Sequence, residues 1–263
     1  MKLGAIPIHY FGRIAQGQMT PEDWYAEAAD VGLDGVELYD AFVGEWSPEA
    51  ASRQAAAIRD AGLAVSMYTT YCDFGMRDAA RRDQQRQRVR RGIESACVAG
   101  TGIVRLTAGA WVEGQDHEAT LQLVAEGLRG CLDDAEKAGV ALALEDHPVI
   151  GTDPADFLRI LELVGDDRLK VNLDTSNPME SGATVLDLLP EVAPRVVHVH
   201  ASDRAADLSH VVTGTGAVPL REAFQHLKAV GFAGFVSMEI GGPPERASVE
   251  ASAANVRRLW AEA

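Results

Sequence analysis

Short apolar runs alternate with longer amphipathic segments along the whole chain. Eight runs of five or six residues are rich in valine, leucine and isoleucine, which is typical of buried parallel strands. Strands are expected at 3–8, 35–39, 63–68, 103–107, 140–145, 169–174, 195–200 and 235–240. The segments between them have helical spacing, and helices are expected at 21–31, 48–61, 78–99, 117–138, 154–164, 184–190, 219–230 and 245–261.

Capping signals at the ends of several segments support these elements. Thr20 and Ser47 each precede a proline, which places an N-cap residue before a first-turn proline. Gly100 and Gly139 follow two helices, where a left-handed residue is favoured. A strand–helix unit repeated eight times predicts α/β architecture, as a single (β/α)8 TIM-barrel domain over residues 1–263. A doubly wound open sheet is the alternative, and it is disfavoured because no GxGxxG follows the first strand.

Composition and charge narrow the class of protein. Of the 263 residues 47% are hydrophobic, which is ordinary for a folded domain, and the formal net charge of -15 opposes binding to nucleic acid or to an acidic membrane surface. The three cysteines have no CxxC spacing and indicate reduced thiols. The apolar run at the N-terminus is broken by Pro7 and His9, so it is too short for a signal peptide or a membrane span. We expect a cytoplasmic protein.

Four consecutive predicted strands end in a polar residue on the same face. Side chains alternate along a strand, so in VVHVHASD (196–203) the two histidines face opposite to the valines between them. The same alternation places an acidic residue at the inner end of strands five, six and eight. The carboxyl ends of barrel strands meet at the mouth, where barrel enzymes hold their chemistry. The residues at this mouth are Glu145, Asp174, His200 and Glu239.

This set of side chains has the chemistry of a metal site. Three converging carboxylates repel one another unless a cation neutralises them, and three carboxylates with one imidazole suit one divalent metal ion. Mn²⁺ is favoured, with Mg²⁺, Co²⁺ or Zn²⁺ as alternatives. His200 is the expected ligand, whereas His198 lies ~6–7 Å deeper in the barrel and is expected to have a structural role, paired with Glu37. A single polar residue at a strand end is readily tolerated near solvent, but four on adjacent strands favour a site.

Further candidates follow the strand ends. His147 comes just after the fifth strand and is predicted to bind a substrate hydroxyl or protonate a leaving group, although an exposed loop histidine is the alternative. Four residues are candidates for the substrate pocket, and for each a plain loop residue is the alternative: His9, which is expected to end the first strand, Trp111, Asp203 and Arg204. Asp203 is also a candidate for orienting the metal site. The glycine-rich segment 214–216 is predicted to form a turn, and a phosphate site is the less favoured alternative. The arginine-rich segment 81–91 reads as a solvated helix face.

The strand ends ALEDH, VNLDTSNP, VHVHASD and VSMEI, with GTG before the penultimate helix, resemble the xylose-isomerase-like sugar phosphate isomerase/epimerase superfamily. This resemblance implies a metal bound by Glu145, Asp174, His200 and Glu239. It also implies that the two glutamates form an acid–base pair, that the substrate is a small sugar, and that the protein is a dimer or tetramer. Ketose epimerases often have a histidine where this chain has Asn177, which we assign to the substrate pocket.

The resemblance and the residues together predict an enzyme. The expected activity is isomerisation or epimerisation of a ketose or related sugar derivative, by proton abstraction next to a carbonyl through a metal-stabilised enediolate. The alternative is a metal-dependent lyase on the same scaffold, either a sugar dehydratase or an enzyme that cleaves a 3-keto glycoside by elimination. Asn177 and the Glu-Asp-His segment at 145–147 slightly favour this alternative. A non-catalytic binding barrel and a nuclease are disfavoured, the first by the four-ligand set and the second by the negative charge.

Overall fold

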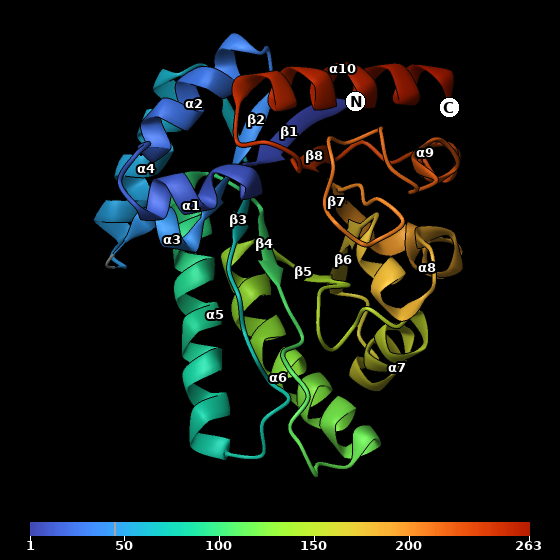
Figure 1. Ribbon diagram of the computed structural model, residues 1–263. Helices are drawn as coiled ribbons and strands as arrows, with labels where there is room; N and C mark the ends of the chain where they lie inside the picture. The colour runs from blue at the N-terminus through green and yellow to red at the C-terminus, as the bar shows by residue number, and fades with distance from the viewer. Residues whose placement is uncertain (45) are drawn as a thin grey trace.

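Eight parallel strands close into a barrel in the order β1 to β8 (Figure 1). The computed structural model describes residues 1–44 and 46–263. The predicted (β/α)8 fold is confirmed. The strands are β1 (Lys2–Ile6), β2 (Gly35–Tyr39), β3 (Ala64–Thr69), β4 (Ile103–Leu106), β5 (Ala141–Glu145), β6 (Leu169–Asp174), β7 (Val196–Ala201) and β8 (Phe235–Glu239).

Helices alternate with these strands, and every predicted helix and strand is present with ends within two residues of the predicted ones. The sequence pattern did not predict the short helices at 11–15 and 40–43 or the 3-10 helices. The helices are α1 (Phe11–Ala15), α2 (Pro21–Asp30), α3 (Asp40–Val43), α4 (Pro48–Asp60), α5 (Ala79–Ala99), α6 (His117–Ala138), α7 (Pro154–Val164), α8 (Val185–Val192), α9 (Leu220–Ala229) and α10 (Arg246–Glu262). The 3-10 helices are η1 (Ile8–Tyr10), η2 (Asn177–Ser181) and η3 (Ala193–Arg195).

The capping residues act as their sequence pattern predicts. The Thr20 hydroxyl accepts the N–H of Asp23 at the start of α2, and the Ser47 hydroxyl accepts the N–H of Ala50 at the start of α4. Gly100 ends α5 with a φ of 76°, a left-handed conformation that glycine adopts without a steric penalty. Local signals therefore set where these helices begin and end.

The first strand ends earlier than its apolar pattern suggests. β1 stops at Ile6, and His9 lies in η1 instead of ending the strand, which corrects the sequence-based expectation. Pro7 causes the break, because proline has no N–H for the strand ladder and its ψ of 63° turns the chain.

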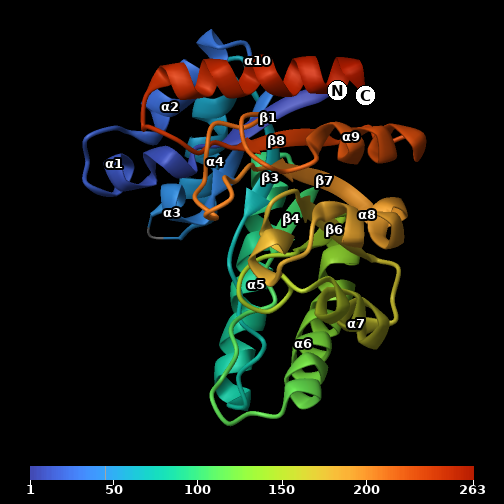
Figure 2. The same cartoon turned by 45° about the vertical axis from the view of Figure 1, so that its right-hand side comes forward.

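The two long helices α5 and α6 extend side by side well past the strand ends (Figures 1 and 2). The arginine-rich segment lies on α5, where Arg88 pairs with Asp40 at 2.6 Å and Arg90 with Asp134 at 2.7 Å. Across the described residues, no helix is both long enough and apolar enough to cross a membrane.

The two faces of the barrel wall differ in chemistry. Outward-facing apolar side chains such as Val36, Leu38 and Val199 are fully buried against the helices. The inward faces instead carry fully or almost fully buried polar groups, which are Glu37, Thr69, Arg105, Glu145, Asn172, Asp174, His198, His200 and Ser237. Buried polar groups need partners, so the interior of this barrel is a hydrogen-bonded network that leads up to the mouth.

Candidate metal centre

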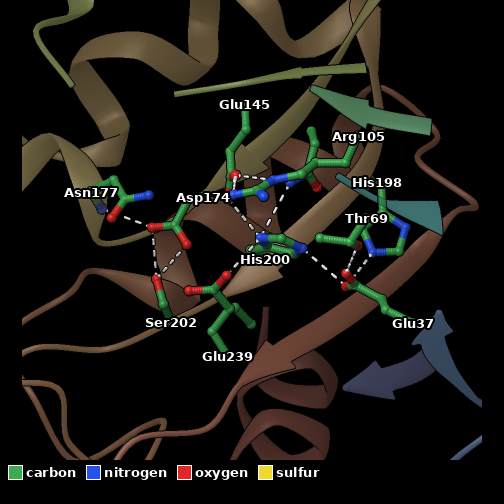
Figure 3. A network of polar contacts seen from close by, with 12 residues as sticks. Glu37, Thr69, Arg105, Glu145, Asp174, Asn177, His198, His200, Ser202 and Glu239 are labelled. Carbon is green, nitrogen blue, oxygen red and sulfur yellow. Dashed lines mark hydrogen bonds and ion pairs between the residues drawn. The ribbon is translucent and has the colours of Figure 1, made fainter. Parts of the chain in front are cut away.

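The ends of β5 to β8 bring four predicted ligands together (Figure 3). One potential ligand atom from each of Glu145, Asp174, His200 and Glu239 lies within 4.8 Å of all the others. His200 Nδ1 is 2.6 Å from Glu145 Oε1 and 3.0 Å from Glu239 Oε1. His200 and Glu145 are fully buried, whereas the Glu239 side chain is 13% exposed and faces the mouth. Metal ligation by this set stays a prediction.

Asp174 is fixed by the turn that follows β6. Its Oδ1 accepts the N–H of Ser176 at 2.8 Å and of Asn177 at 2.7 Å. The Ser202 hydroxyl lies 2.7 and 2.8 Å from the two carboxylate oxygens, and the Asp174 N–H donates to Asp146 Oδ1 at 2.7 Å. These contacts orient one carboxylate edge toward His200 and Glu239 without a metal ion.

The charges in the cluster are strongly perturbed by burial. Burial raises the pKa of Asp174, and together with the nearby Glu239 and Glu145 it brings that pKa to about 7. Burial alone would lower the pKa of His200, but Glu37, Glu145 and Glu239 outweigh it and raise that pKa well above its ordinary value. Three acidic groups around one imidazole are the donor set that a hard or borderline divalent cation prefers. The residues therefore fit such an ion.

Below the cluster, Glu37 joins the two histidines of β7. Its Oε1 lies 3.2 Å from His198 Nε2 and 2.9 Å from His200 Nε2, while the Thr69 hydroxyl donates to Oε2. The predicted pairing of His198 with Glu37 is present, whereas the second hydrogen bond, from His200 Nε2 to Glu37, was not predicted. Figure 3 shows His200 between the three acidic groups on one side and Glu37 on the other.

Arg105 of β4 is a site residue that the sequence reasoning missed. Its guanidinium is 1% exposed and forms an ion pair with Glu145, and its Cζ lies 4.3 Å from the centroid of the Tyr71 ring. Burial by itself would raise the pKa of Glu145, but Arg105 and His200 hold it well below its ordinary value. The available signal was the alternation in Ile103–Leu106, which places an arginine on the inner face of a buried strand.

His147 lies beside this cluster. Its Nδ1 is 2.6 Å from the Pro148 carbonyl, and its ring packs edge-on against Tyr71 with 5.4 Å between centroids. Burial lowers the pKa of His147, so the ring is neutral at pH 7. The Nδ1–H then donates to the carbonyl, and Nε2 carries the lone pair. His147, Tyr71 and Thr107 help line a cavity of about 390 Å³.

Comparison with known proteins identifies the family of the chain. The model of a family described as xylose isomerase-like TIM barrel matches residues 25–259. The chain belongs to this family. Among curated proteins, a putative hydroxypyruvate isomerase of Streptomyces coelicolor is 24% identical over 234 residues, which cover 81% of this chain and 83% of that protein. An uncharacterised protein of Methanocaldococcus jannaschii is 29% identical over 112 residues, 40% of this chain and only 38% of that protein.

Solved structures share the whole fold of this xylose isomerase-like barrel. The probable 3-DHS dehydratase AsbF of Bacillus anthracis superimposes with a TM-score of 0.78 at 20% identity, covering 98% of each chain. The D-psicose 3-epimerase of Clostridium cellulolyticum, crystallised with D-tagatose, superimposes with a TM-score of 0.80 at 15% identity, covering 99% of each chain. At these identities the likeness establishes the fold alone.

In this xylose isomerase-like barrel, Asp203 organises the loop after β7 and does not orient the metal cluster, which corrects the expectation for this residue. Its carboxylate accepts four backbone N–H groups, from Arg204, Gly214, Gly216 and Val218. Two of these belong to the GTG segment, so those N–H groups are engaged within the protein. The segment is therefore a turn, as preferred from the sequence, and not a phosphate site.

Arg204 and Asn177 bind each other instead of pointing separately into the mouth. The Arg204 guanidinium donates to Asn177 Oδ1 at 3.1 Å and to Ser176 Oγ at 3.2 Å, and it pairs with Glu180 at 2.8 Å. These contacts tie the turn after β6 to the loop after β7. Direct contact of either residue with a substrate stays a prediction.

The aromatic candidates lie against neighbouring rings. His9 stacks on Tyr10 with 3.9 Å between centroids, and Trp111 stacks on His117 with 4.6 Å. Burial, with a smaller effect of Arg13, lowers the pKa of His9 to about 4, so its ring is neutral. Both ring nitrogens of His9 are buried without a partner in the described part of the chain. Their role in substrate binding stays a prediction.

Proposed function

We propose that this chain is a divalent-metal-dependent isomerase or epimerase that acts on a ketose or related sugar derivative. The observation that carries the proposal is the convergence of Glu145, Asp174, His200 and Glu239 within 4.8 Å at the barrel mouth. Family membership supports it, as does the relative described as a putative hydroxypyruvate isomerase, which matches most of the chain. The homo-oligomer implied by the family resemblance is part of the proposal and is testable by light scattering.

The four clustered side chains would hold the cation, for which Mn²⁺ is favoured over Mg²⁺, Co²⁺ or Zn²⁺. When bound, a divalent cation supplies Lewis-acid chemistry, which makes a C–H bond beside a substrate carbonyl more acidic. The protein contributes a preorganised cluster, because Asp174 is already oriented by Ser176, Asn177 and Ser202. Little reorganisation is then needed when the ion binds.

The glutamates around the ion would carry out proton transfer. Glu239 is the proposed base, because among the three clustered carboxylates it alone has a partly exposed side chain. Glu145, the second member of the proposed acid–base pair, is held by Arg105, which makes its carboxylate a weaker base. Removal of a proton on one side and return of a proton on the other gives epimerisation, and return to the neighbouring carbon gives isomerisation.

The geometry of His147 favours a lyase as the second candidate function. With Nδ1 engaged by the Pro148 carbonyl, the Nε2 lone pair is free to act as a base. In a dehydration, Nε2 would take the proton beside the carbonyl and deliver it to the departing hydroxyl, which leaves as water. The structural neighbour described as a probable 3-DHS dehydratase supports dehydration as the second candidate reaction.

Proton NMR in D₂O distinguishes the two reactions. The protein, loaded with Mg²⁺ to avoid paramagnetic broadening, is incubated with a panel of ketoses, keto acids and 3-keto glycosides. Deuterium beside the carbonyl together with a new intact sugar is the expected result. Loss of water or of an aglycone would instead establish the lyase, and exchange with none of the substrates would reject both.

Two variants locate the chemistry. Glu239→Gln should abolish exchange, whereas the matched control Glu94→Gln, an exposed position on α5, should be unchanged. Near-normal turnover in Glu239→Gln would reject the assigned base. His147→Asn separates the two reactions, because an epimerase using the two glutamates should keep much of its exchange, whereas a lyase depending on Nε2 should lose it.

A further inference from the structure

Glu37 is a buried carboxylate that the proposed chemistry does not use. It lies on the inner face of β2, one layer below the metal cluster, and is fully buried. Its Oε1 accepts hydrogen bonds from Nε2 of His200 at 2.9 Å and from Nε2 of His198 at 3.2 Å. Its Oε2 accepts a hydrogen bond from the Thr69 hydroxyl. Three donors on one carboxylate are enough to stabilise its negative charge in the interior.

The strand registers bring these groups together. Between Val36 and Leu38, the two residues that flank Glu37, the pairing with β3 shifts by one residue. A second shift occurs between β6 and β7, where one extra residue, Val197, precedes His198. Such irregularities in a strand re-aim nearby side chains. Here the first shift lies at Glu37 and the second lies just before His198.

The bond to Glu37 decides which nitrogen of His200 can bind a metal. Glu37 can only accept a hydrogen bond, so Nε2 must carry a proton. A histidine that binds a metal must be neutral, so the proton on the other nitrogen, Nδ1, is the one that a cation displaces. Nδ1 is the atom that faces Glu145 and Glu239, at 2.6 and 3.0 Å. A carboxylate behind a ligating histidine fixes its ring orientation and raises its basicity as a ligand.

We infer that Glu37 is a positioning residue for the metal centre, which holds His200 with Nδ1 directed at the cation. The inference rests on the proposed function, because it assigns Glu37 a part in the same metal site. His198 shares the carboxylate but does not face the cluster, so its part is to complete the hydrogen bonds of Glu37. The sequence motifs at the strand ends do not contain Glu37, which lies 163 positions from His200.

Calorimetric titration with Mn²⁺ tests this role without relying on turnover. Glu37→Ala should bind Mn²⁺ about 10–100-fold more weakly than the wild type, the usual effect of removing a partner behind a metal ligand. Glu37→Gln keeps the shape of the side chain and an accepting oxygen, so its affinity for Mn²⁺ should fall by a smaller factor. This variant also provides a test if Glu37→Ala does not fold. The control His198→Asn perturbs the same layer and should bind nearly as tightly as the wild type.

The outcomes separate the inference from the proposed function. A wild type that binds no divalent cation overturns both. A wild type that binds one ion, with Glu37→Ala and Glu37→Gln unchanged in affinity, overturns the inference alone, as does an equal loss in His198→Asn. Two ions per chain would make Glu37 a ligand of a second ion and also overturn it. Nitrogen-15 NMR of the Zn²⁺-loaded protein should find the His200 proton on Nε2, and a proton on Nδ1 would contradict the inference.

Discussion

Removing Arg105 gives the sharpest test of how charge is balanced in this barrel. The Arg105–Glu145 pair is fully buried, with side-chain exposures of 1% and 0%. Substituting one partner of such a pair destabilises a protein by about 3–5 kcal/mol, because the other charge stays buried. His200 remains 2.6 Å from Glu145, so Arg105→Met should fall near the lower end, about 3 kcal/mol. That is a large part of the total stability of a domain, about 5–15 kcal/mol.

The stability lost in Arg105→Met should depend on whether a divalent cation is bound. A divalent cation among the carboxylates provides Glu145 with a second counter-charge, so only the contact between Arg105 and the Tyr71 ring is then lost, worth about 0.5–2 kcal/mol. By linkage, the difference of about 2 kcal/mol must appear as tighter metal binding by the variant, roughly 30-fold. Arg105 therefore lowers the metal affinity while it stabilises the metal-free protein.

Urea unfolding followed by circular dichroism, in EDTA and in saturating Mn²⁺, measures both quantities. Arg90→Met is the matched control, because Arg90 forms an exposed pair with Asp134 and should lose less than about 1 kcal/mol in either condition. An equal loss for Arg105→Met with and without Mn²⁺, or weaker Mn²⁺ binding by the variant, would refute this account of the buried charge.

Three further predictions use the same measurements. His200→Asn should abolish Mn²⁺ binding, whereas His198→Asn should mainly lower the urea midpoint, and equal losses of metal would show that the wrong histidine was assigned. In EDTA, Asp174 has a folded-state pKa of about 7 against an ordinary value of about 3.9, so its contribution to stability is lost as the pH rises from about 4 to 7. Asp174→Asn should therefore be more stable than the wild type at pH 8 but not at pH 4, and an advantage that does not grow with pH would contradict this. Gly216→Ala should destabilise the protein by about 1–3 kcal/mol, because a Cβ there would overlap the Asp203 carboxylate, and an unchanged midpoint would show that the loop yields.

The architecture and the candidate ligands could be predicted from the sequence, because both depend on local periodicity. Alternation along 169–174 and 195–200 fixed which side chains face inward, and capping residues such as Thr20 and Gly100 fixed where helices begin and end. Barrel closure then places all strand ends at one mouth, so four in-phase polar residues could be predicted to meet without coordinates.

Most pairings among these groups could not be predicted from the sequence, although the pairing of His198 with Glu37 was. Alternation gives the face on which Arg105 and Glu37 lie, but it does not give a rotamer or a partner on another strand. The deciding contacts join residues 40 positions apart for Arg105 with Glu145 and 163 apart for Glu37 with His200. The same reason explains Asp203, whose carboxylate binds the loop backbone up to 15 positions away instead of the metal cluster. Hydrogen bonds over these distances follow from packing, which a single sequence pattern does not encode.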